Sequence, residues 1–406
     1  MPRPLRRALL DLAAAALVWL LLGLTLMQGN ELWLPPAAQP LGHALYRLAY
    51  WLTLPGQWAG LWVRPVAHHH VPASDPLLAA ALTALGLLGV WWGLCALHRR
   101  WSAWPASLPR PGRRELLLKL GLGAFGLGGL AVLGLGAWGV FVEPSRLVIR
   151  RYRIPIRGLP AWAEGLRIVL ISDTHHGPYV SLPYLRRAVA MANSLQADVV
   201  ALTGDYVHRT ARAIPAGIGV LTGLKARFGR FAVLGNHDHW AGAEACRAAL
   251  LAGGNHLLDY RHIYLGPDGP RDEPMEGALC LAGLGDLWED ERPPETAFAG
   301  VDPATPCIVL SHNPDCAEYL PEGVRVDLML AGHTHGGQVY VPGKRTPRIP
   351  SRFGQWYAGG ICKGPRCPVV VSRGVGMAYL PVRLGVRPEI VLVTLTRSPD
   401  QGEPDP

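Results

Sequence analysis

The segment Gly332-His333-Thr334-His335-Gly336-Gly337-Gln338 ends an apolar run at residues 326–331, and it is the feature that most restricts how this chain can fold. Two imidazoles emerge there at the end of a buried strand. In an extended chain, residues two apart point to the same side, so we expect His333 and His335 to share one side. The flanking glycines allow backbone and ligand to approach closely. A histidine pair of this kind is more often solvated or hydrogen-bonded than metal-bound, so its role depends on the rest of the chain.

The composition indicates a membrane part and a soluble part. Of the 406 residues, 50% are hydrophobic and 17% are charged, whereas about 25% are charged in typical soluble domains. The apolar excess lies mainly in residues 1–145, for which we predict a membrane region with about three transmembrane helices. The predicted spans are residues 8–27, 77–97 and 120 to about 141. The segment 41–63 contains a histidine, an arginine and a proline, and it fits an interfacial or re-entrant segment better than a span.

Basic residues at the ends of the apolar segments predict the topology. Three arginines precede the first span, and a basic loop at residues 98–119 separates the second span from the third. Because positively charged loops stay in the cytoplasm, the third span carries the chain outward. We therefore expect a multi-pass protein of the bacterial inner membrane, with its soluble domain periplasmic or otherwise extracytoplasmic. Arg113-Arg114 also resembles a twin-arginine export signal. If residues 41–63 formed a fourth span, the soluble domain would instead be cytoplasmic.

The formal net charge of +9 does not by itself predict a nucleic-acid partner. A nucleic-acid-binding domain gathers basic residues and interleaved aromatic residues on one face. Many arginines of this chain flank apolar segments, which membrane topology explains. We expect association with a membrane and none with nucleic acid, and the sequence does not predict an oligomeric state.

The seven cysteines include no Cys-x-x-Cys pair, so they do not form a zinc-ribbon pattern. Cys362 and Cys367 are close enough in sequence to bridge a hairpin in an oxidising compartment. Two free thiols in a loop are the alternative.

From residue 166 onward, short apolar strands alternate with helical segments, which is typical of an α/β fold. We predict that residues 146–165 form a linker and lead-in strand, residues 166–397 the α/β domain, and residues 398–406 a disordered tail. An amphipathic helix is expected at residues 183–195. The predicted strands are residues 166–171, 198–203, 231–234, 279–282, 307–310, 326–331, 369–371 and 389–396. Apart from one of these strands, residues 261–306 are predicted to be loop and edge hairpin.

Five of the predicted strands end in side chains that can bind a metal ion. In chain order, these are Asp173 and His175, Asp205, Asn236 and His237, His312, and His333 and His335. In α/β sheets, ligands bind outside the carboxyl ends of the strands, so we expect one common site. Carboxylate, imidazole and amide donors without thiolates suit zinc, manganese or iron. We predict two divalent ions bridged by Asp205, the central residue in this order. For a single residue the alternative is structural, since Asp173 or Asp205 could cap a helix and Asn236 could stabilise a turn.

These motifs resemble the signature of the calcineurin-like metallophosphoesterases over residues 166–396. The signature is Asp-x-His, Gly-Asp, Gly-Asn-His-Asp, a lone His after a strand, and Gly-His-x-His. Residues 332–338, 350–354 and 380–383 are similar to a bacterial membrane-associated branch, the YkuE/YaeI-like proteins. The resemblance implies an αββα metallophosphoesterase sandwich, which in this chain follows an α-helical transmembrane region.

The resemblance also implies a role for each motif residue. One metal ion would be held by Asp173, His175, Asp205 and His335, and the other by Asp205, Asn236, His312 and His333. His237 would stand beside the scissile phosphate and protonate the leaving group or stabilise charge, with Asp238 orienting it. An imidazolium supplies both a positive charge and a proton at the departing oxygen, which agrees with this role.

We therefore predict a membrane-anchored, dinuclear-metal phosphoesterase that hydrolyses a phosphodiester or a pyrophosphate by attack of metal-bound hydroxide. Membrane tethering is consistent with a lipid-linked substrate or a nucleotide-linked glycolipid. The alternative is a UDP-2,3-diacylglucosamine pyrophosphatase of lipid A synthesis, which needs a cytoplasmic site, and a non-catalytic metal-binding scaffold is the least favoured hypothesis. Side chains that could also serve the site, or could simply be solvated, are His176, His239, Arg348, Arg352 and Arg373.

Overall fold

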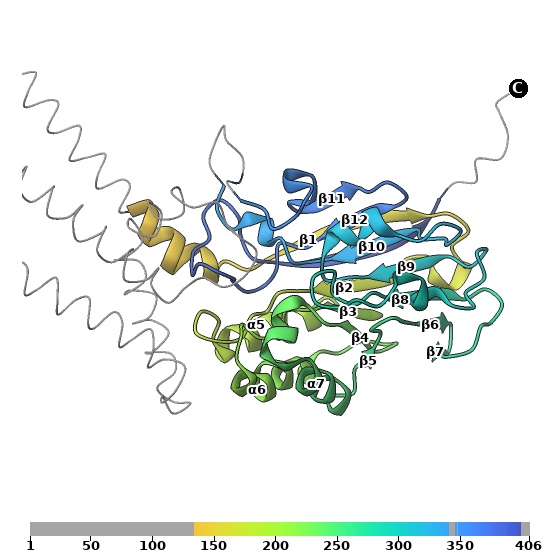
Figure 1. The fold of residues 1–406 in the computed structure, drawn as a ribbon, viewed down its shortest axis with the longest axis horizontal. Helices are drawn as coiled ribbons and strands as arrows, with labels where there is room; N and C mark the ends of the chain where they lie inside the picture. The colour runs from red at the N-terminus through yellow and green to blue at the C-terminus, as the bar shows by residue number, and fades with distance from the viewer. Residues whose placement is uncertain (1–133, 341–345, 347, 399–406) are drawn as a thin grey trace, which may run out of the picture. The chain divides into compact units, whose positions relative to one another are not determined.

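The computed structural model describes residues 134–340, 346 and 348–398 (Figure 1). The chain divides into two compact units, Met1–Trp138 and Gly139–Pro406, and the second contains nearly all of the described residues. Outside the described residues lie the predicted membrane segments 8–27, 41–63 and 77–97, most of 120–141, and the tail after residue 398. Within the described part of the chain, no helix is both long and apolar enough to cross a membrane.

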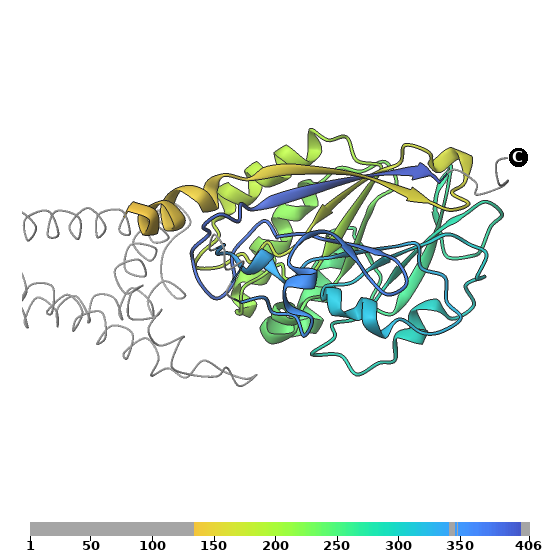
Figure 2. The same ribbon diagram turned by 90° about the horizontal axis from the view of Figure 1, so that it is seen from above.

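The first of two sheets contains six strands in the order β1-β13-β2-β3-β4-β5. Strands β2 to β5 are parallel to one another, and β13 pairs antiparallel with β2 and parallel with β1. Figure 2 shows the long strands β1 and β13 side by side. The strand bounds are β1 (Val148–Ile156), β2 (Arg167–Ile171), β3 (Val199–Thr203), β4 (Arg230–Val233), β5 (His256–Leu257) and β13 (Glu389–Arg397).

The second sheet contains seven strands in the order β11-β12-β10-β9-β8-β6-β7. Its four central strands are parallel, while β11, β6 and β7 pair antiparallel, so both sheets are mixed. The strand bounds are β6 (Arg261–Gly266), β7 (Gly269–Arg271), β8 (Leu279–Gly283), β9 (Cys307–Leu310), β10 (Leu328–Ala331), β11 (Gly360–Lys363) and β12 (Pro368–Val371). Every strand predicted from residue 166 onward has a counterpart in the two sheets, and β6 and β7 form the predicted edge hairpin.

The apolar faces of the two sheets form the main core between them. Alternation along β9 illustrates how the sequence assigns the faces. Ile308 and Leu310 belong to the core that both sheets share, whereas Cys307 and Val309 belong to a second core on the other face of β9. All four are at most 1% exposed. Burial on both faces explains why the strand is apolar throughout, as expected of parallel strands in a layered fold.

Three α-helices lie together beside β2 to β5 in Figure 1. They are α5 (Leu182–Asn193), which matches the helix predicted at residues 183–195, α6 (Ile214–Gly219) and α7 (Asn236–Ala252). The predicted αββα arrangement was wrong in its fourth layer. Over the second sheet, the described chain supplies the 3-10 turns η6 (Pro294–Phe298) and η7 (Pro314–Tyr319) instead of α-helices. Both turns begin with a proline and span at most six residues, too few for a stable helix of several turns.

The two cysteines considered for a disulfide, Cys362 and Cys367, are free and buried in the structure. In the hairpin of β11 and β12, the residue opposite Cys362 is Val369. This register keeps Cys367 from facing Cys362 directly, which agrees with the free-thiol alternative.

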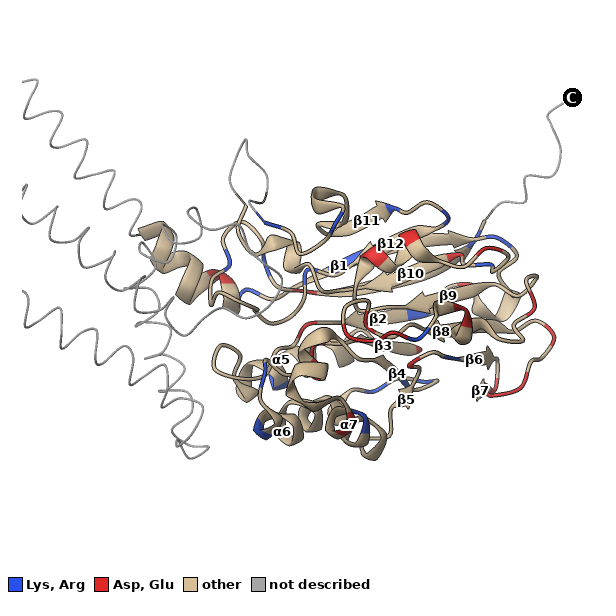
Figure 3. Ribbon diagram, in the orientation of Figure 1, with Lys and Arg blue, Asp and Glu red and all other residues tan. Residues whose placement is uncertain are grey.

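Charged residues lie mainly in loops and at strand ends, as Figure 3 shows. Asp173 and Asp205 lie in the loops that leave β2 and β3, after Ser172 and Gly204, but they are only 0% and 2% exposed. Burying two carboxylates is costly unless they are paired, hydrogen-bonded or bound to a metal ion. The ends of β2 and β3 therefore form a candidate functional site.

Candidate metal centre

The loops that follow β2 and β3 hold each other in an unusual backbone conformation. Asp173, His175 and Asp205 have φ angles of 55°, 44° and 57°. Positive φ is uncommon for residues other than glycine, and such strain persists only where the surroundings fix it. The surroundings here include two backbone hydrogen bonds, from Asp173 N to Gly204 O at 3.0 Å and from His175 N to Asp205 O at 2.9 Å. The strained loops thus direct three polar side chains to one point.

The loop that follows β10 carries His333 and His335, and its backbone is also left-handed at both residues, with φ of 68° and 51°. The backbone N–H of His333 donates to both oxygens of Asp173, each at 3.1 Å, and His335 begins the 3-10 turn η8 (His335–Gly337). The expectation that the two imidazoles share one side of an extended chain was therefore wrong. The turned backbone sends the two side chains to different clusters.

Two glycines permit the close packing of these loops. A Cβ atom on Gly332 would lie 1.8 Å from Ser172 Oγ and 2.4 Å from Asp173 Oδ2. A Cβ atom on Gly235 would lie 2.3 Å from Asp205 Oδ1. Real Cβ atoms essentially never show contacts this short, so a side chain at either position would force neighbouring atoms to shift.

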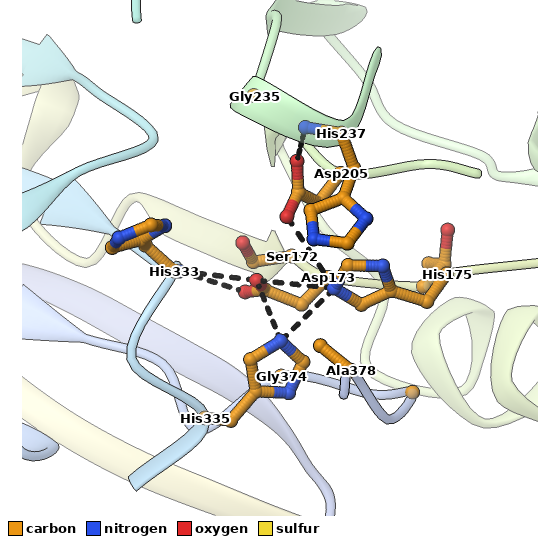
Figure 4. A network of polar contacts seen from close by, with 12 residues as sticks. Ser172, Asp173, His175, Asp205, Gly235, His237, His333, His335, Gly374 and Ala378 are labelled. Carbon is orange, nitrogen blue, oxygen red and sulfur yellow. Dashed lines mark hydrogen bonds and ion pairs between the residues drawn. The ribbon is translucent and has the colours of Figure 1, made fainter. Parts of the chain in front are cut away.

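The first group of potential ligands, which we name the Asp173 cluster, consists of Asp173, His175 and His335 (Figure 4). His335 Nε2 lies 3.2 Å from Asp173 Oδ1 and 3.0 Å from His175 Nε2. All three side chains are at most 3% exposed. Two imidazole nitrogens and a carboxylate oxygen therefore converge on a small buried volume.

The second group, the His312 cluster, consists of Asp205, Asn236, His312 and His333. His312 Nε2 lies 3.1 Å from both Asn236 Oδ1 and His333 Nδ1, and 3.3 Å from Asp205 Oδ2. The other ring nitrogen, Nδ1, lies 2.8 Å from the carbonyl oxygen of Thr203, to which it can donate. That hydrogen bond orients the ring and leaves Nε2 as the atom that faces the cluster, an arrangement common among metal-binding histidines.

Asp205 lies between the two clusters. Its Oδ2 atom is 3.4 Å from His175 Nε2 in the Asp173 cluster and 3.3 Å from His312 Nε2 in the His312 cluster. Its Oδ1 atom accepts a hydrogen bond of 2.8 Å from the backbone N–H of His237. A carboxylate in this position can contribute to two ion sites at once, as predicted for a bridging ligand.

Burial and the charge of Asp205 set the protonation states of the two clusters. Burial raises the pKa of Asp205, but His312, His237 and His175 outweigh burial and hold the pKa well below the ordinary value. Burial lowers the pKa of His175 well below its ordinary range and that of His333 to about 3. The carboxylate of Asp205 is thus ionised and the imidazoles of His175 and His333 are neutral, which are the forms that bind metal ions. Burial lowers the pKa of His312, but Asp205 outweighs burial and raises that pKa to about 10, so metal binding at His312 would release a proton.

Several buried polar atoms at the site have no hydrogen-bond partner within the described residues. These atoms are His175 Nδ1, Asn236 Nδ2 and His333 Nε2. Nitrogen lone pairs that face each other and face carboxylate oxygens at about 3 Å repel one another unless protons or cations lie between them. The donor set, imidazole and carboxylate with one amide oxygen, therefore fits divalent transition metals.

Comparison with known proteins identifies the family to which this site belongs. The profile of the family described as calcineurin-like phosphoesterase matches residues 166–337. The chain is 31% identical to the uncharacterized metallophosphoesterase YkuE of Bacillus subtilis over 70% of this chain and 97% of YkuE. The chain belongs to the calcineurin-like phosphoesterases. It is accordingly a metal-dependent phosphoesterase, a hydrolase.

Two other relatives in this family carry more specific names. The phosphodiesterase YaeI of Escherichia coli is 31% identical over 63% of this chain and 90% of YaeI. The UDP-2,3-diacylglucosamine pyrophosphatase LpxG of Chlamydia muridarum is 26% identical over 64% of this chain and 93% of LpxG. Relatives of this phosphoesterase thus include proteins named for diester hydrolysis and for pyrophosphate hydrolysis.

His237 lies at the edge of the two clusters, with its ring centroid 4.6 Å from that of His175. It is 2% exposed, and its Nδ1 is hydrogen-bonded to the backbone carbonyl of His208. This contact requires a proton on Nδ1, so the reactive nitrogen of His237 is Nε2. The candidate acid of the phosphoesterase is therefore oriented by the loop after β3.

The predicted role of Asp238 in orienting His237 does not match its contacts. The Asp238 carboxylate accepts hydrogen bonds from the backbone N–H groups of Asp205 at 2.8 Å, Tyr206 at 2.9 Å and Gly235 at 3.0 Å. Burial, and then the charge of Asp205, raise the pKa of Asp238 to about 8. Asp238 thus fixes the backbone of the loop that carries Asp205, and the His208 carbonyl takes the orienting position at His237.

The further candidates lie in varied surroundings. His176 is buried, with Nδ1 at 3.0 Å from Val180 O, and His239 is half-buried on α7. Arg352 donates to the hydroxyl of Tyr319, and Arg373 forms an ion pair with Glu389 at 3.7 Å. The Arg348 guanidinium lies over the ring of Tyr379, 5.6 Å from its centroid. Of the three candidate arginines, Arg348 is the one whose aromatic partner also contacts His237.

Two residues that support the site had no predicted role. Arg383 is fully buried, donates to the carbonyl oxygens of Arg373 and Gly376, and lies 3.3 Å from His335 Nδ1. Burial lowers its pKa to about 10. Gln338 hydrogen-bonds the loop at residues 378–382. Both residues occur in segments that resemble the YkuE/YaeI-like branch. This resemblance is the sequence feature that could have indicated a role for them.

Proposed function

We propose that this chain is a membrane-anchored phosphoesterase with two divalent metal ions that hydrolyses a phosphodiester or a pyrophosphate. One ion would be held by Asp173, His175, Asp205 and His335, and the other by Asp205, Asn236, His312 and His333. The observation that carries the proposal is the position of Asp205 Oδ2, within 3.4 Å of a ligand nitrogen in each cluster. The choice among manganese, zinc and iron is left to elemental analysis.

When bound, two divalent ions supply positive charge that polarises the phosphoryl group and acidifies a water molecule for attack on phosphorus. The residues of the chain perform the remaining tasks. Asp205, Asp173, Asn236 and the imidazoles would hold the two ions, and the burial of these side chains excludes bulk water. His237, held at Nδ1 by the His208 carbonyl, directs Nε2 toward the departing oxygen and gives it a proton. Asp238 keeps the loop of Asp205 in place.

The membrane part of the proposal rests on the apolar segments of residues 1–145 and on their flanking arginines. The positive-inside pattern favours a domain outside the cytoplasm. The second candidate, a UDP-2,3-diacylglucosamine pyrophosphatase with a cytoplasmic site, is favoured by the similarity to LpxG. A reporter fused after Pro399 distinguishes the two, because alkaline phosphatase is active outside the cytoplasm and green fluorescent protein fluoresces inside.

His237→Ala tests the proposed chemistry. General acids contribute about 10²–10⁴-fold to hydrolysis, so we expect a loss of that size in kcat for bis(p-nitrophenyl) phosphate with Mn²⁺ supplied. Glu244→Ala, on the same helix α7, is the matched control and should retain at least about half of the wild-type rate, since its side chain is 88% exposed and pairs only with the neighbouring Arg247 among the described residues. Wild-type turnover in the His237 variant, at unchanged metal content, would refute the assignment. A purified protein that binds neither manganese nor zinc would instead support a non-catalytic scaffold.

A further inference from the structure

An aromatic residue in a strained conformation lies over the proposed active site. Tyr379 has a φ of 56°, in the left-handed region that aromatic residues rarely adopt. Its ring meets the ring of His237 edge to face, with centroids 6.1 Å apart, and the residue remains 39% exposed. Within the described part of the chain, its hydroxyl has no hydrogen bond. A partly exposed phenol is thus held beside the proposed general acid.

The strained conformation is imposed by the motif that contains the metal-binding histidines. The buried side chain of Gln338 accepts a hydrogen bond of 2.7 Å from Ala378 N. It also donates to the carbonyl oxygens of Leu380 at 2.9 Å and Val382 at 3.2 Å. These three bonds clamp the residues on both sides of Tyr379. Strain that is fixed in this way is typical of residues positioned for a functional contact.

Two arginines stand beside aromatic rings that contact His237. The Arg209 guanidinium lies 4.9 Å from the ring centroid of Trp240, which is itself 4.5 Å from the ring of His237. Arg348 lies 5.6 Å from the ring of Tyr379. Neither guanidinium forms an ion pair or a hydrogen bond with another described residue, although carboxylates are its usual partners. Both positive charges are therefore available to a ligand.

The two arginines also act on a common atom. Burial raises the pKa of the Tyr379 hydroxyl, Asp205 raises it further, and Arg348 and Arg209 lower it. Both guanidinium groups therefore lie close enough to Tyr379 to affect its hydroxyl group electrostatically. Together, the three residues present two positive charges and one neutral donor next to the proposed leaving-group acid.

We propose that Arg209, Arg348 and Tyr379 form a subsite for a second phosphoryl group on the leaving-group side, so that the preferred substrate is a diphosphate diester. This inference rests on the proposed function, because His237 defines the leaving-group side. A simple phosphodiester carries one negative charge, which the metal centre would bind. A diphosphate diester carries a second negative charge, on the far side of the bridging oxygen. That charge matches two guanidinium groups that have no anionic partner among the described residues.

The reaction is balanced without a further reactant. The oxygen of water forms a new bond to the phosphorus at the metal centre, and the bond from this phosphorus to the bridging oxygen breaks. The electron pair of the broken bond leaves on the bridging oxygen, which takes a proton from His237, and the proton lost by water passes to solvent. The products are two phosphate monoesters, one of which departs through the subsite.

Kinetics on two substrate classes test the subsite. The full-length protein with Mn²⁺ is assayed on bis(p-nitrophenyl) phosphate and on two diphosphate diesters, UDP-glucose and CDP-diacylglycerol in detergent micelles. We expect Arg209→Ala and Arg348→Ala each to lower kcat/KM for a diphosphate diester about tenfold or more, mainly through KM, since contacts to charged groups contribute about that much. Tyr379→Phe should lower it about threefold or more. The rate on bis(p-nitrophenyl) phosphate should change less than about twofold, because this substrate has no second phosphoryl group to occupy the subsite.

Arg352→Ala is the matched control, because that guanidinium already has the hydroxyl of Tyr319 as a partner, and it should leave both substrate classes unchanged. Equal losses on both classes, or no loss on the diphosphates, would overturn the subsite. So would a wild-type enzyme that cleaves the simple diester and neither diphosphate. A metal-loaded wild-type protein that cleaves none of the three would instead count against the proposed function itself. Metal content and melting temperature of each variant confirm that the fold is intact.

Discussion

The Asp173 cluster and the His312 cluster contain similar donor atoms. They differ in the groups that contact the other ring nitrogen, Nδ1, of their histidines. In the His312 cluster, Nδ1 of His312 meets a carbonyl acceptor at 2.8 Å, which fixes the ring for metal binding. In the Asp173 cluster, Nδ1 of His175 has no partner among the described residues, and Nδ1 of His335 faces the Arg383 guanidinium at 3.3 Å. A buried cation behind a ligand disfavours a second cation in front of it. We infer that the His312 cluster binds its ion more tightly.

Replacing Asp205, the ligand that the two clusters share, should have the largest effect, because it weakens metal binding in both clusters at once. Asp205→Asn preserves shape, and its carbonyl oxygen can still accept from His237 N, but an NH₂ group then faces His175 and His312. The charge at the bridge is lost, so we expect both ions to bind weakly and kcat to fall about 10³-fold or more. Elemental analysis after gel filtration and a diester assay measure the two effects. Two equivalents of bound metal in this variant would show that Asp205 is not shared.

Removing one histidine from each cluster should have a smaller and unequal effect. We expect His335→Ala to retain about one equivalent of metal, held by the His312 cluster, whereas His312→Ala should retain clearly less than one. Measured affinities should differ by about 10–100-fold in the same direction. Titration with a chelator, followed by Mn²⁺ electron paramagnetic resonance, checks the order in the wild-type protein. If the His335 variant loses more metal than the His312 variant, the comparison between the clusters is wrong.

The strands that carry the site could be predicted because their pattern is local. The strand predicted at residues 307–310 has the same bounds as β9. Four apolar residues lie between Pro306 and a polar segment, so the sequence itself marks both ends of the strand. The ligand types at the strand ends followed from the same pattern. The fourth layer was mispredicted because nothing in the family resemblance indicates that η6 and η7, short and proline-initiated, replace helices in this chain.

Features that depend on left-handed backbone or on distant loops could not be predicted. Periodicity assumes an extended chain after β10, but φ at His333 and His335 is positive, and so the two imidazoles diverge. The partner of His237 is a backbone carbonyl, that of His208, which no side-chain motif encodes. Tyr379 and the Arg209–Trp240 pair meet at His237 from loops far apart in the sequence, and a single sequence does not reveal this proximity.

The smallest effects should come from substituting the glycines that bring the loops together. The two substitutions should affect the Asp173 cluster and the His312 cluster differently. Gly332→Ala places a methyl group 2.4 Å from Asp173 Oδ2, and Gly235→Ala places one 2.3 Å from Asp205 Oδ1 and 2.8 Å from His312 Cε1. Each should lower the free energy of unfolding by about 1–3 kcal/mol, as overpacking does. Gly219→Ala, with no atom within 4 Å of its Cβ and no positive φ, is the matched control and should be neutral. Urea unfolding measures the change in stability.

Metal analysis of the same variants then bears on the comparison between the clusters. The Gly332 variant displaces Asp173 and should release the ion of the Asp173 cluster first, because that cluster has less support behind its imidazoles. The Gly235 variant displaces the shared carboxylate and should weaken both ions. Both variants could instead release one metal ion per protein from the same cluster. In that case, hydrogen bonds to the outer ring nitrogens of the histidines would not control metal affinity, and access to solvent would control the exchange of ions.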